Sequence, residues 1–357
     1  MNERNATIEF IMTQCKRWPA IRPQDLLKAL HQSVFGCGHL VTDETGCLAQ
    51  IEQELTTCFS GNGPELEPLD GEFCRLYMRY LKRSGLSPKT LCRLFVLSAE
   101  KSDGSVETLE KKLSILLELA ETENLPFSSI EASEAIVQWR AMGYPPCRHS
   151  REFRAAYAPA YRVVSQEYMW VLPLLEAIDC RLDRQPKVLV ALEGGSAAGK
   201  STLAALLSKF FDCNVFHMDD FFLQPQQRTK DRLAELGGNV DWERFLDEVL
   251  QPLAQGEAVQ YRPYDCHTQA VGGPVRMESK ALNIVEGTYS MHPALADYFD
   301  LSVFLRISPE QQRYRIERRN QPEVQRRFFD TWIPLERRYF EGMDTAEHCD
   351  LILEVEP

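Results

Sequence analysis

From the N-terminus to about residue 145, apolar side chains recur at intervals of three and four positions. This spacing places the apolar side chains on one face of a helix and predicts a series of amphipathic helices. Pro23 stands just before the first of these segments and Gly85 just after the third, as expected of helix ends. The predicted helices are Gln24–Phe35, Gly46–Phe59, Glu72–Arg83, Lys89–Lys101, Val106–Glu121 and Ile130–Met142. We therefore expect residues 1–150 to form an all-helical domain of unknown role.

Residues 151–184 are expected to connect this domain to the rest of the chain. Within them, Tyr161–Leu182 has the apolar content of one long helix that bends near Pro173. No apolar run approaches the ~18 to 20 residues needed to cross a bilayer, and no basic segment followed by an apolar one marks a secretory signal. We expect no membrane association and a cytoplasmic location.

From Lys187 onward the pattern changes to short β-branched runs separated by segments of helical length. This alternation is typical of βα units and a parallel sheet. The predicted strands are Val188–Leu192, Asn214–Met218, Leu282–Val285, Leu301–Ile307 and Leu351–Val355. Between the second and third, Ala258–Met277 contains two tyrosines and a Gly272-Gly273 pair, which indicate an inserted hairpin. Residues 185–357 should therefore form an α/β domain with a five-stranded parallel sheet between helical layers.

The first of these strands runs into a glycine-rich loop with a defined spacing. Its residues are Gly194, Gly195, Ser196, Ala197, Ala198, Gly199, Lys200, Ser201 and Thr202, which spell GxxxxGK[ST] between a strand and a helix. Such a loop turns backbone amides toward an anion, and the helix N-terminus adds its positive dipole end. Lys200 can then reach the β- and γ-phosphates of ATP, and Ser201 can ligate Mg²⁺. The loop predicts a P-loop nucleotide site.

Charge restricts where other anions can bind. The chain carries 40 Lys and Arg against 52 Asp and Glu, a net charge of −12, which argues against a nucleic-acid partner. Gln311–Arg327 nevertheless concentrates six arginines against two glutamates. An Arg-rich helix that closes over a phosphate loop stabilises a transferring phosphoryl group and excludes water. Arg313 and Glu317 also have the spacing of a solvated surface pair, so both interpretations stay open.

A pair of acids, Asp219 and Asp220, follows the second predicted strand. The carboxyl edge of a parallel sheet is where ligands bind, and a carboxylate there can accept the proton of an attacking hydroxyl. The alternative is a pair of solvated loop acids.

Together these features resemble the uridine kinase and phosphoribulokinase family of P-loop kinases. The resemblance spans about residues 185–357 and rests on the phosphate loop and on four further elements. They are Asp219-Asp220-Phe221-Phe222, Asn239-Val240-Asp241 before a helix, Tyr264-Asp265 in the hairpin, and Glu286-Gly287 at the end of the third strand.

The resemblance implies roles for individual residues. It makes Asp219 the base for the acceptor hydroxyl, places Asp241, Tyr264 and Phe222 at the acceptor, and gives Glu286 a part in organising Mg²⁺. Arg315 and Arg319 match the spacing of the lid arginines best. Simpler interpretations remain for three of these residues: Asp241 as a helix N-cap, Glu286 as a turn acid and Tyr264 as a packing residue of the hairpin.

The function implied is an ATP- and Mg²⁺-dependent kinase that phosphorylates a hydroxyl of a small metabolite, most simply a nucleoside-like one. Nucleoside-specific members have a His five residues after the hairpin Tyr, where this chain has Gln269, so another hydroxylated metabolite also fits. The alternative is a P-loop ATPase or switch that couples nucleotide to a protein partner of the helical domain.

Two groups in the N-terminal half carry no assigned function. His31, Cys37, His39 and Cys47 lie within 17 positions and are soft ligands, but their spacing fits no common zinc-finger pattern and favours a helix turn. Arg148, His149, Arg151, Arg154 and Arg162 form a basic group that either contacts a substrate anion or is solvated.

Overall fold

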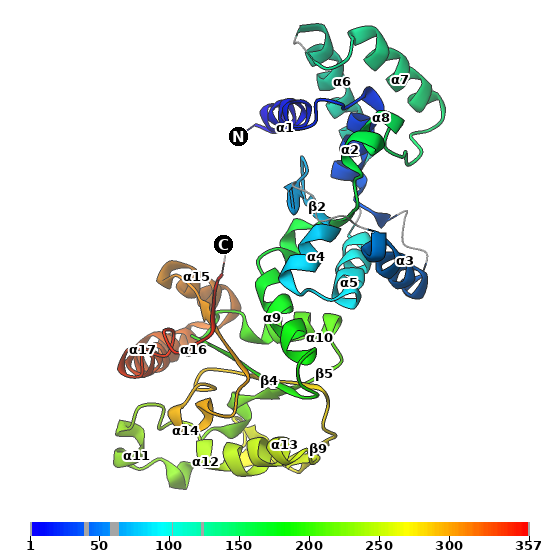
Figure 1. Ribbon diagram of the computed structural model, residues 1–357. Coiled ribbons are helices and arrows are strands. Elements are labelled where there is room, and N and C mark those ends of the chain that lie inside the picture. Colours follow the sequence, from blue (N-terminus) through cyan, green and yellow to red (C-terminus); the bar gives the residue numbers. More distant parts are fainter. Residues whose placement is uncertain (1, 39–42, 58–63, 102, 123–124, 356–357) are drawn as a thin grey trace. The chain divides into compact units, whose positions relative to one another are not determined.

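The computed structural model describes residues 2–38, 43–57, 64–101, 103–122 and 125–355 (Figure 1). The chain divides into two compact units, Met1–Leu172 and Pro173–Pro357. Within the described ranges, every helix is too short or too polar to span a lipid bilayer.

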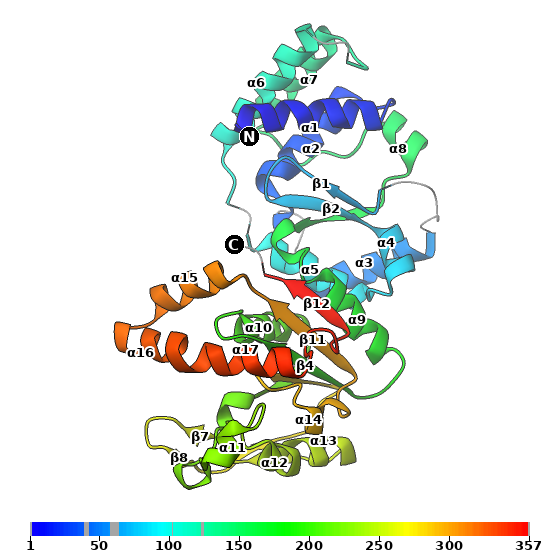
Figure 2. The same cartoon turned by 90° about the vertical axis from the view of Figure 1, so that its left-hand side faces the viewer.

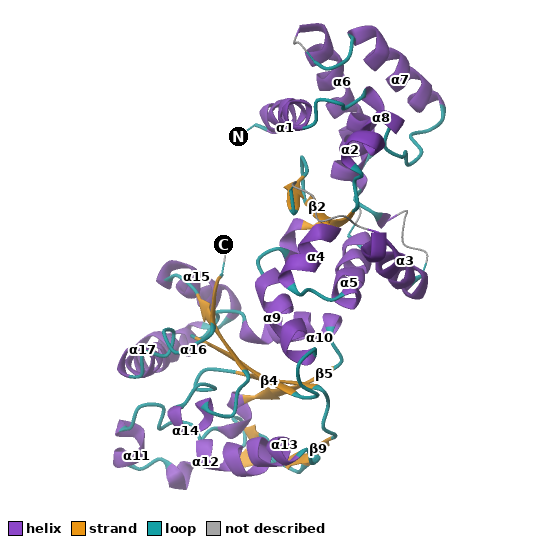
Figure 3. Ribbon diagram, in the orientation of Figure 1, coloured by secondary structure: helices purple, strands orange, loops and turns teal. Residues whose placement is uncertain are grey.

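Helices dominate the N-terminal unit, as the purple ribbons of Figure 3 show. They are α1 (Glu3–Arg17), α2 (Pro23–Phe35), α3 (Glu44–Thr57), α4 (Met78–Ser84), α5 (Pro88–Ala99), α6 (Val106–Thr122), α7 (Ser129–Ala141) and α8 (Arg151–Tyr157). Five of the six predicted helices are confirmed, whereas α1 and α8 were not predicted. Ser128 and Glu131 form the capping box that starts α7. Apolar faces of α1, α2, α6 and α7 meet in one core around Leu30 and Leu113.

A small antiparallel sheet corrects the expectation of an all-helical unit. Its three strands are β1 (Leu66–Pro68), β2 (Phe73–Tyr77) and β3 (Tyr161–Ser165), with β2 in the middle. The predicted helix Glu72–Arg83 is thus wrong in its first half, because all five residues of β2 are buried and show no alternation. The predicted helix Tyr161–Leu182 is also wrong: β3 is followed by a 3₁₀ turn at Gln166–Tyr168 and by α9 (Leu172–Leu182).

A buried ion pair crosses this sheet. Arg75 of β2 lies opposite Glu67 of β1, and its guanidinium contacts the Glu67 carboxylate at 3.1 Å, with each side chain 1% exposed. Glu67 also accepts hydrogen bonds from Gln14, Trp18 and Tyr77. Burial alone raises the pKa of Glu67, but the Arg75 charge and these donors outweigh it and hold the pKa below its usual value.

The C-terminal unit has the predicted five-stranded parallel sheet. Its strands are β4 (Val188–Gly194), β5 (Cys213–His217), β10 (Leu282–Glu286), β11 (Leu301–Arg306) and β12 (Leu351–Glu354), in the order β12-β11-β4-β10-β5. Each agrees with a predicted strand to within two residues at either end. The hairpin is confirmed as well: β6 (Val259–Tyr261) pairs with β9 (Val275–Met277), and β7 (Tyr264–Asp265) with β8 (Ala270–Val271).

Helices lie on both sides of this sheet, which Figure 1 shows nearly edge-on. On one side, α10 (Lys200–Phe210) packs against β4, β5 and β10. On the other, α12 (Trp242–Phe245), a π-helical segment at Leu246–Leu250 and α13 (Gln251–Gln255) share a core with Phe216 and Val285. The remaining helical elements are α11 (Lys230–Ala234), α14 (Pro293–Ala296), α15 (Pro309–Arg319), α16 (Pro322–Arg327), a π-helical segment at Phe328–Trp332 and α17 (Ile333–Gly342). Figure 2 shows α15, α16 and α17 together beside the sheet.

Arg75 and Arg17 contact the same Glu67 carboxylate, but we expect their replacement to lower the free energy of unfolding by different amounts. Replacing Arg75 by Ala removes the buried cation beside Glu67 and leaves that buried carboxylate with the largely exposed Arg17, so we expect the Arg75→Ala variant to lose about 3 to 5 kcal/mol of unfolding free energy. Chemical denaturation measures this loss. Arg17 also contacts Glu67, at 3.3 Å, but it is 41% exposed, so Arg17→Ala should cost less than about 1 kcal/mol. Equal losses in the two variants would contradict this account.

Candidate functional site

The loop Gly194–Gly199 joins β4 to α10 in the strand–loop–helix context expected of a phosphate loop. Gly194 and Gly199 have φ values of +145° and +99°, a region that side-chain-bearing residues rarely adopt. A Cβ at Gly194 would also lie 2.7 Å from the Leu305 carbonyl oxygen of the neighbouring strand β11. Glycine is therefore required at the start of the loop for both conformation and space.

Lys200, the first residue of α10, folds back under this loop. Its ammonium donates to the carbonyl oxygens of Gly194 at 2.7 Å and Gly195 at 2.9 Å, and to the Thr288 hydroxyl at 3.3 Å. The side chain is buried, and in the described part of the chain no carboxylate forms an ion pair with it. A buried ammonium held by neutral oxygens keeps its charge available to an anion in the loop.

Ser201, Glu286 and His217 converge beside the loop. The Glu286 Oε1 atom accepts a hydrogen bond from the Ser201 hydroxyl at 2.9 Å and lies 2.6 Å from the His217 Nδ1 atom. Burial raises the pKa of Glu286, but these two contacts outweigh it and hold the pKa below its usual value. The hydrogen bond between Glu286 and His217 is also the main reason that the pKa of His217 is raised. A hydroxyl and a carboxylate oxygen are ligands that suit Mg²⁺.

Asp219 follows β5 in the 3₁₀ turn Met218–Phe221. Its side chain is open to solvent. Surrounding protein atoms raise the pKa of its carboxyl group, whereas the positive charge of Lys200 lowers this pKa. The two groups thus act on each other electrostatically at the carboxyl edge of the sheet. The neighbouring Asp220 has a different environment, because its carboxylate accepts a hydrogen bond from the Tyr261 hydroxyl at 3.2 Å.

The residues expected at the acceptor already have partners within the protein. Asp241 is buried, caps α12 by accepting from the Arg244 backbone amide at 3.2 Å, and accepts from Gln227 Nε2 at 2.8 Å. The Tyr264 hydroxyl accepts from Arg228 at 2.8 Å. Phe222 is half-buried and forms an isolated backbone bridge to Val240. The capping of α12 by Asp241 and the packing of Tyr264 in the hairpin are therefore both observed.

The Arg-rich segment is not one helix. Asn320 and Gln321, followed by Pro322, separate α15 from α16, since proline favours a new helix start. Arg315 donates to the Ala197 carbonyl oxygen at 3.3 Å and so lies against the phosphate loop, whereas Arg319 is exposed at the end of α15. Arg313 forms the predicted surface pair with Glu317 at 3.4 Å.

Several residues that contact this site were not expected from the sequence, among them His217 and Glu336. His217 is the last residue of β5 and could have been found by its position at the carboxyl edge of the sheet. Glu336 of α17 was not recognisable from its local sequence. Its carboxylate accepts hydrogen bonds from the Ser196 hydroxyl and, at 2.9 Å, from the Ser196 backbone amide. Burial is the main cause of its raised pKa.

The possible soft-ligand site of the N-terminal unit is not assembled in the described ranges. No group of three or more His, Cys, Asp or Glu side chains there could hold a metal ion. His31 packs against the rings of Phe35 and Trp139, and Cys37 is fully buried. His39 lies outside the described residues.

The C-terminal half is similar to known proteins. Residues 189–321 match a family model described as "Phosphoribulokinase / Uridine kinase family", which confirms the resemblance expected for the C-terminal half. Similar solved structures include a "Possible Uridine Kinase" from Bacillus stearothermophilus, at 19% identity and a TM-score of 0.39, with 50% of this chain and 98% of that chain covered. A "putative fructose transport system kinase" from Silicibacter sp. TM1040 matches at 24% identity and a TM-score of 0.38, with 50% and 96% covered.

The contact between Glu286 and His217 can be tested by titration. In the intact protein we expect the imidazole pKa of His217 to lie above the ordinary value of about 6.5, because ionised Glu286 favours the charged ring. In a Glu286→Gln variant this pKa should fall toward about 6.5. NMR titration of the histidine ring protons measures both values, and Glu278→Gln, at an exposed site, serves as the control. An unchanged His217 pKa in Glu286→Gln would contradict the assignment.

Proposed function

We propose that this chain, whose residues 189–321 match the phosphoribulokinase and uridine kinase family, is an ATP- and Mg²⁺-dependent kinase that phosphorylates a hydroxyl of a small metabolite. One observation carries the proposal. The parallel register of β4, β10 and β5 ends these strands at one edge of the sheet, where both the loop that leads to Lys200 and the turn that holds Asp219 begin. A phosphate loop alone occurs in both kinases and nucleotide switches. A carboxylate at the same sheet edge provides, in addition, a base for the hydroxyl of a phosphoryl acceptor.

Several residues of the loop region have a part in holding the donor nucleotide. Backbone amides of the loop bind the phosphates, other than those of Ser196 and Ala198, which donate to Glu336 and Gly195. The Lys200 ammonium neutralises charge on the β- and γ-phosphoryl groups. Ser201 and Glu286 would hold Mg²⁺, and a bound metal would supply positive charge to the phosphates. The hydrogen bond of His217 keeps the Glu286 carboxylate ionised and oriented, as an outer-shell partner does for a metal ligand.

Phosphoryl transfer then requires a base and a means to stabilise charge. Asp219 accepts the proton of the acceptor hydroxyl, which directs the oxygen toward the γ-phosphoryl group. Arg315, already against the loop at Ala197, contributes positive charge to the transferring group, and Arg319 joins it when α15 moves closer.

The acceptor side suits a small hydroxylated molecule, nucleoside-like in the simplest case. Asp241, Tyr264 and Phe222 come from three segments next to Asp219, and their protein partners fix their orientation. Gln269 lies at the turn between β7 and β8, at the tip of the hairpin. An amide there can donate and accept hydrogen bonds, which fits recognition of hydroxyl or carbonyl groups.

Acceptor-dependent turnover tests the proposal. ADP release should require a hydroxylated acceptor, and Asp219→Asn should lower kcat about 10²- to 10⁴-fold because the base is lost while nucleotide binding remains. Asp247→Asn removes an exposed carboxylate of the same unit and should leave kcat unchanged. ATP hydrolysis that needs no acceptor and does not respond to Asp219→Asn would instead favour a P-loop ATPase or switch.

The pH dependence of turnover follows from the environment of Asp219. The base acts only when ionised, and the protein atoms around Asp219 raise its pKa, so activity should be lost as pH falls through a value above the usual ~3.9. A profile of kcat/KM against pH, with circular dichroism at each pH to confirm folding, measures this acid limb. Full activity in folded protein at pH 4 would contradict the assignment.

A further inference from the structure

A cleft lined by charged and polar side chains lies in the N-terminal unit. Its volume is about 740 Å³, within the usual range for small-molecule sites. Basic and polar side chains from α2, from residues 148–154 at and before the start of α8, and from β3 line it, among them Lys28, Arg148, His149, Arg154, Tyr161 and Arg162. The acids Asp43 and Glu54 also line it, near and within α3. Phe95 and Val163 add apolar surface. The kinase assignment uses none of these residues.

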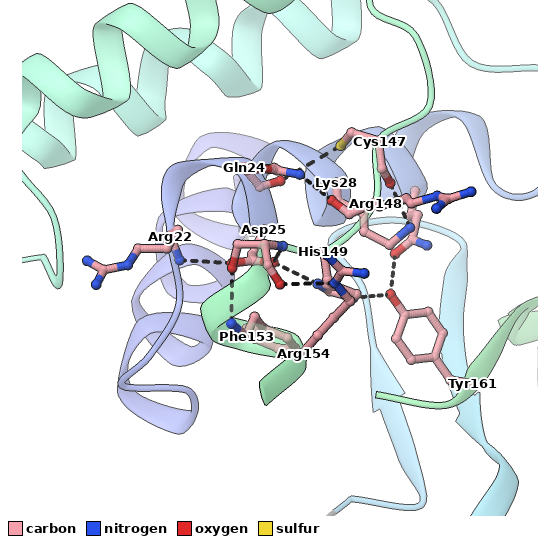
Figure 4. A network of polar contacts seen from close by, with 12 residues as sticks. Arg22, Gln24, Asp25, Lys28, Cys147, Arg148, His149, Phe153, Arg154 and Tyr161 are labelled. Atoms are coloured by element: carbon pink, nitrogen blue, oxygen red, sulfur yellow. Dashed lines mark hydrogen bonds and ion pairs between the residues drawn. The ribbon is translucent and has the colours of Figure 1, made fainter. Parts of the chain in front are cut away.

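Asp25, His149 and Tyr161 form a hydrogen-bonded row at this cleft (Figure 4). Asp25 Oδ1 lies 2.8 Å from His149 Nδ1, and His149 Nε2 lies 2.6 Å from the Tyr161 hydroxyl. Asp25 also accepts from the amide and hydroxyl of Ser150. Burial raises the pKa of Asp25, but its hydrogen bonds outweigh this and keep it ionised, so the carboxylate can only accept.

This arrangement fixes the direction of every hydrogen bond in the row. Because Asp25 accepts, the proton of His149 is on Nδ1, and burial lowers the pKa of His149 to about 4, so the ring is neutral. Neutral His149 therefore accepts at Nε2, and the single proton of the Tyr161 hydroxyl points to it at 2.6 Å rather than to the more distant Gln32 Oε1 atom at 3.4 Å. Tyr161 is one of the residues that line the cleft, and its oxygen keeps lone pairs that can accept from a donor of a bound molecule.

Positive charge surrounds this tyrosine. The Lys28 ammonium is half-buried and donates to the Cys147 carbonyl oxygen at 2.9 Å, and desolvation lowers its pKa. Arg148 and Arg154 are exposed, and in the described residues neither they nor Lys28 form an ion pair with a carboxylate. Arg162 differs, because Glu54 neutralises it at 2.8 Å. Three cations of a chain with net charge −12 thus line one cleft without an ion pair among the described residues. The two acids of the same cleft are engaged elsewhere: Glu54 pairs with Arg162, and Asp43 accepts a hydrogen bond from the Gly46 backbone amide.

We propose that this cleft binds a phosphate ester of a small hydroxylated metabolite. Lys28, Arg148 and Arg154 bind the phosphate, because cationic donors from separate segments match its charge and its several oxygens. The Tyr161 oxygen accepts a hydrogen bond from a ligand hydroxyl, and the His149 and Asp25 side chains orient that phenol. This binding site is independent of the kinase assignment, since it lies wholly within Met1–Leu172.

Hydrogen–deuterium exchange of the full chain separates this cleft from the phosphate loop. Glucose 6-phosphate at millimolar concentration, used as the probe, should protect backbone amides in residues 148–163, and glucose should not. Peptides that cover residues 194–202 report binding at the phosphate loop in the same experiment. The Arg148→Ala/Arg154→Ala double variant should weaken protection of 148–163 at least ~10-fold in apparent Kd, since two charge-assisted contacts are lost.

Two further variants make the outcome decisive. Arg151→Ala removes an exposed arginine of α8 that does not line the cleft, and it should bind the probe as the unaltered protein does. Tyr161→Phe removes only the hydroxyl, so it should weaken glucose 6-phosphate binding but leave binding of inorganic phosphate unchanged. Absence of protection in 148–163, or protection that survives in the double variant, would overturn the proposal.

Discussion

The parallel register of β4, β10 and β5 is the constraint on which the candidate site depends. Glu286 at the end of β10 pairs with Leu192 of β4 on one side and with His217 of β5 on the other. The three strands therefore end at one edge, and the segments that follow them meet there. This register brings the phosphate loop, Asp219 and Glu286 together although almost a hundred residues of sequence separate the first from the last.

The C-terminal unit was predictable because its signals are local. Each strand is a short apolar run, and the phosphate loop has a spacing that backbone geometry enforces, as the φ of +145° at Gly194 illustrates. What could not be predicted was contact between distant segments. Nothing in the sequence around Glu336 indicates that its carboxylate accepts a hydrogen bond from the Ser196 amide. Such contacts are set by packing, which leaves no periodic trace in the sequence.

In the N-terminal unit too, the sequence predicts local helices but not buried contacts between segments. Its helices follow from amphipathic spacing, but β2 was mistaken for a helix because a strand buried on both faces does not alternate. Arg75 lies in that strand, fully buried, where residue type alone suggests an exposed position. Glu67 and Gln32 make this possible by accepting hydrogen bonds from its guanidinium. A charged residue in an apolar run can therefore mark a buried polar network.

The central claim is that Lys200 and Asp219 act on the same phosphoryl group. A crystal structure of the protein with Mg²⁺ and a non-hydrolysable ATP analogue tests this most directly. The account predicts that the terminal phosphate contacts the Lys200 ammonium and that the Asp219 carboxylate faces the same phosphorus from the acceptor side. A nucleotide bound in the loop with Asp219 directed into a separate space would contradict it.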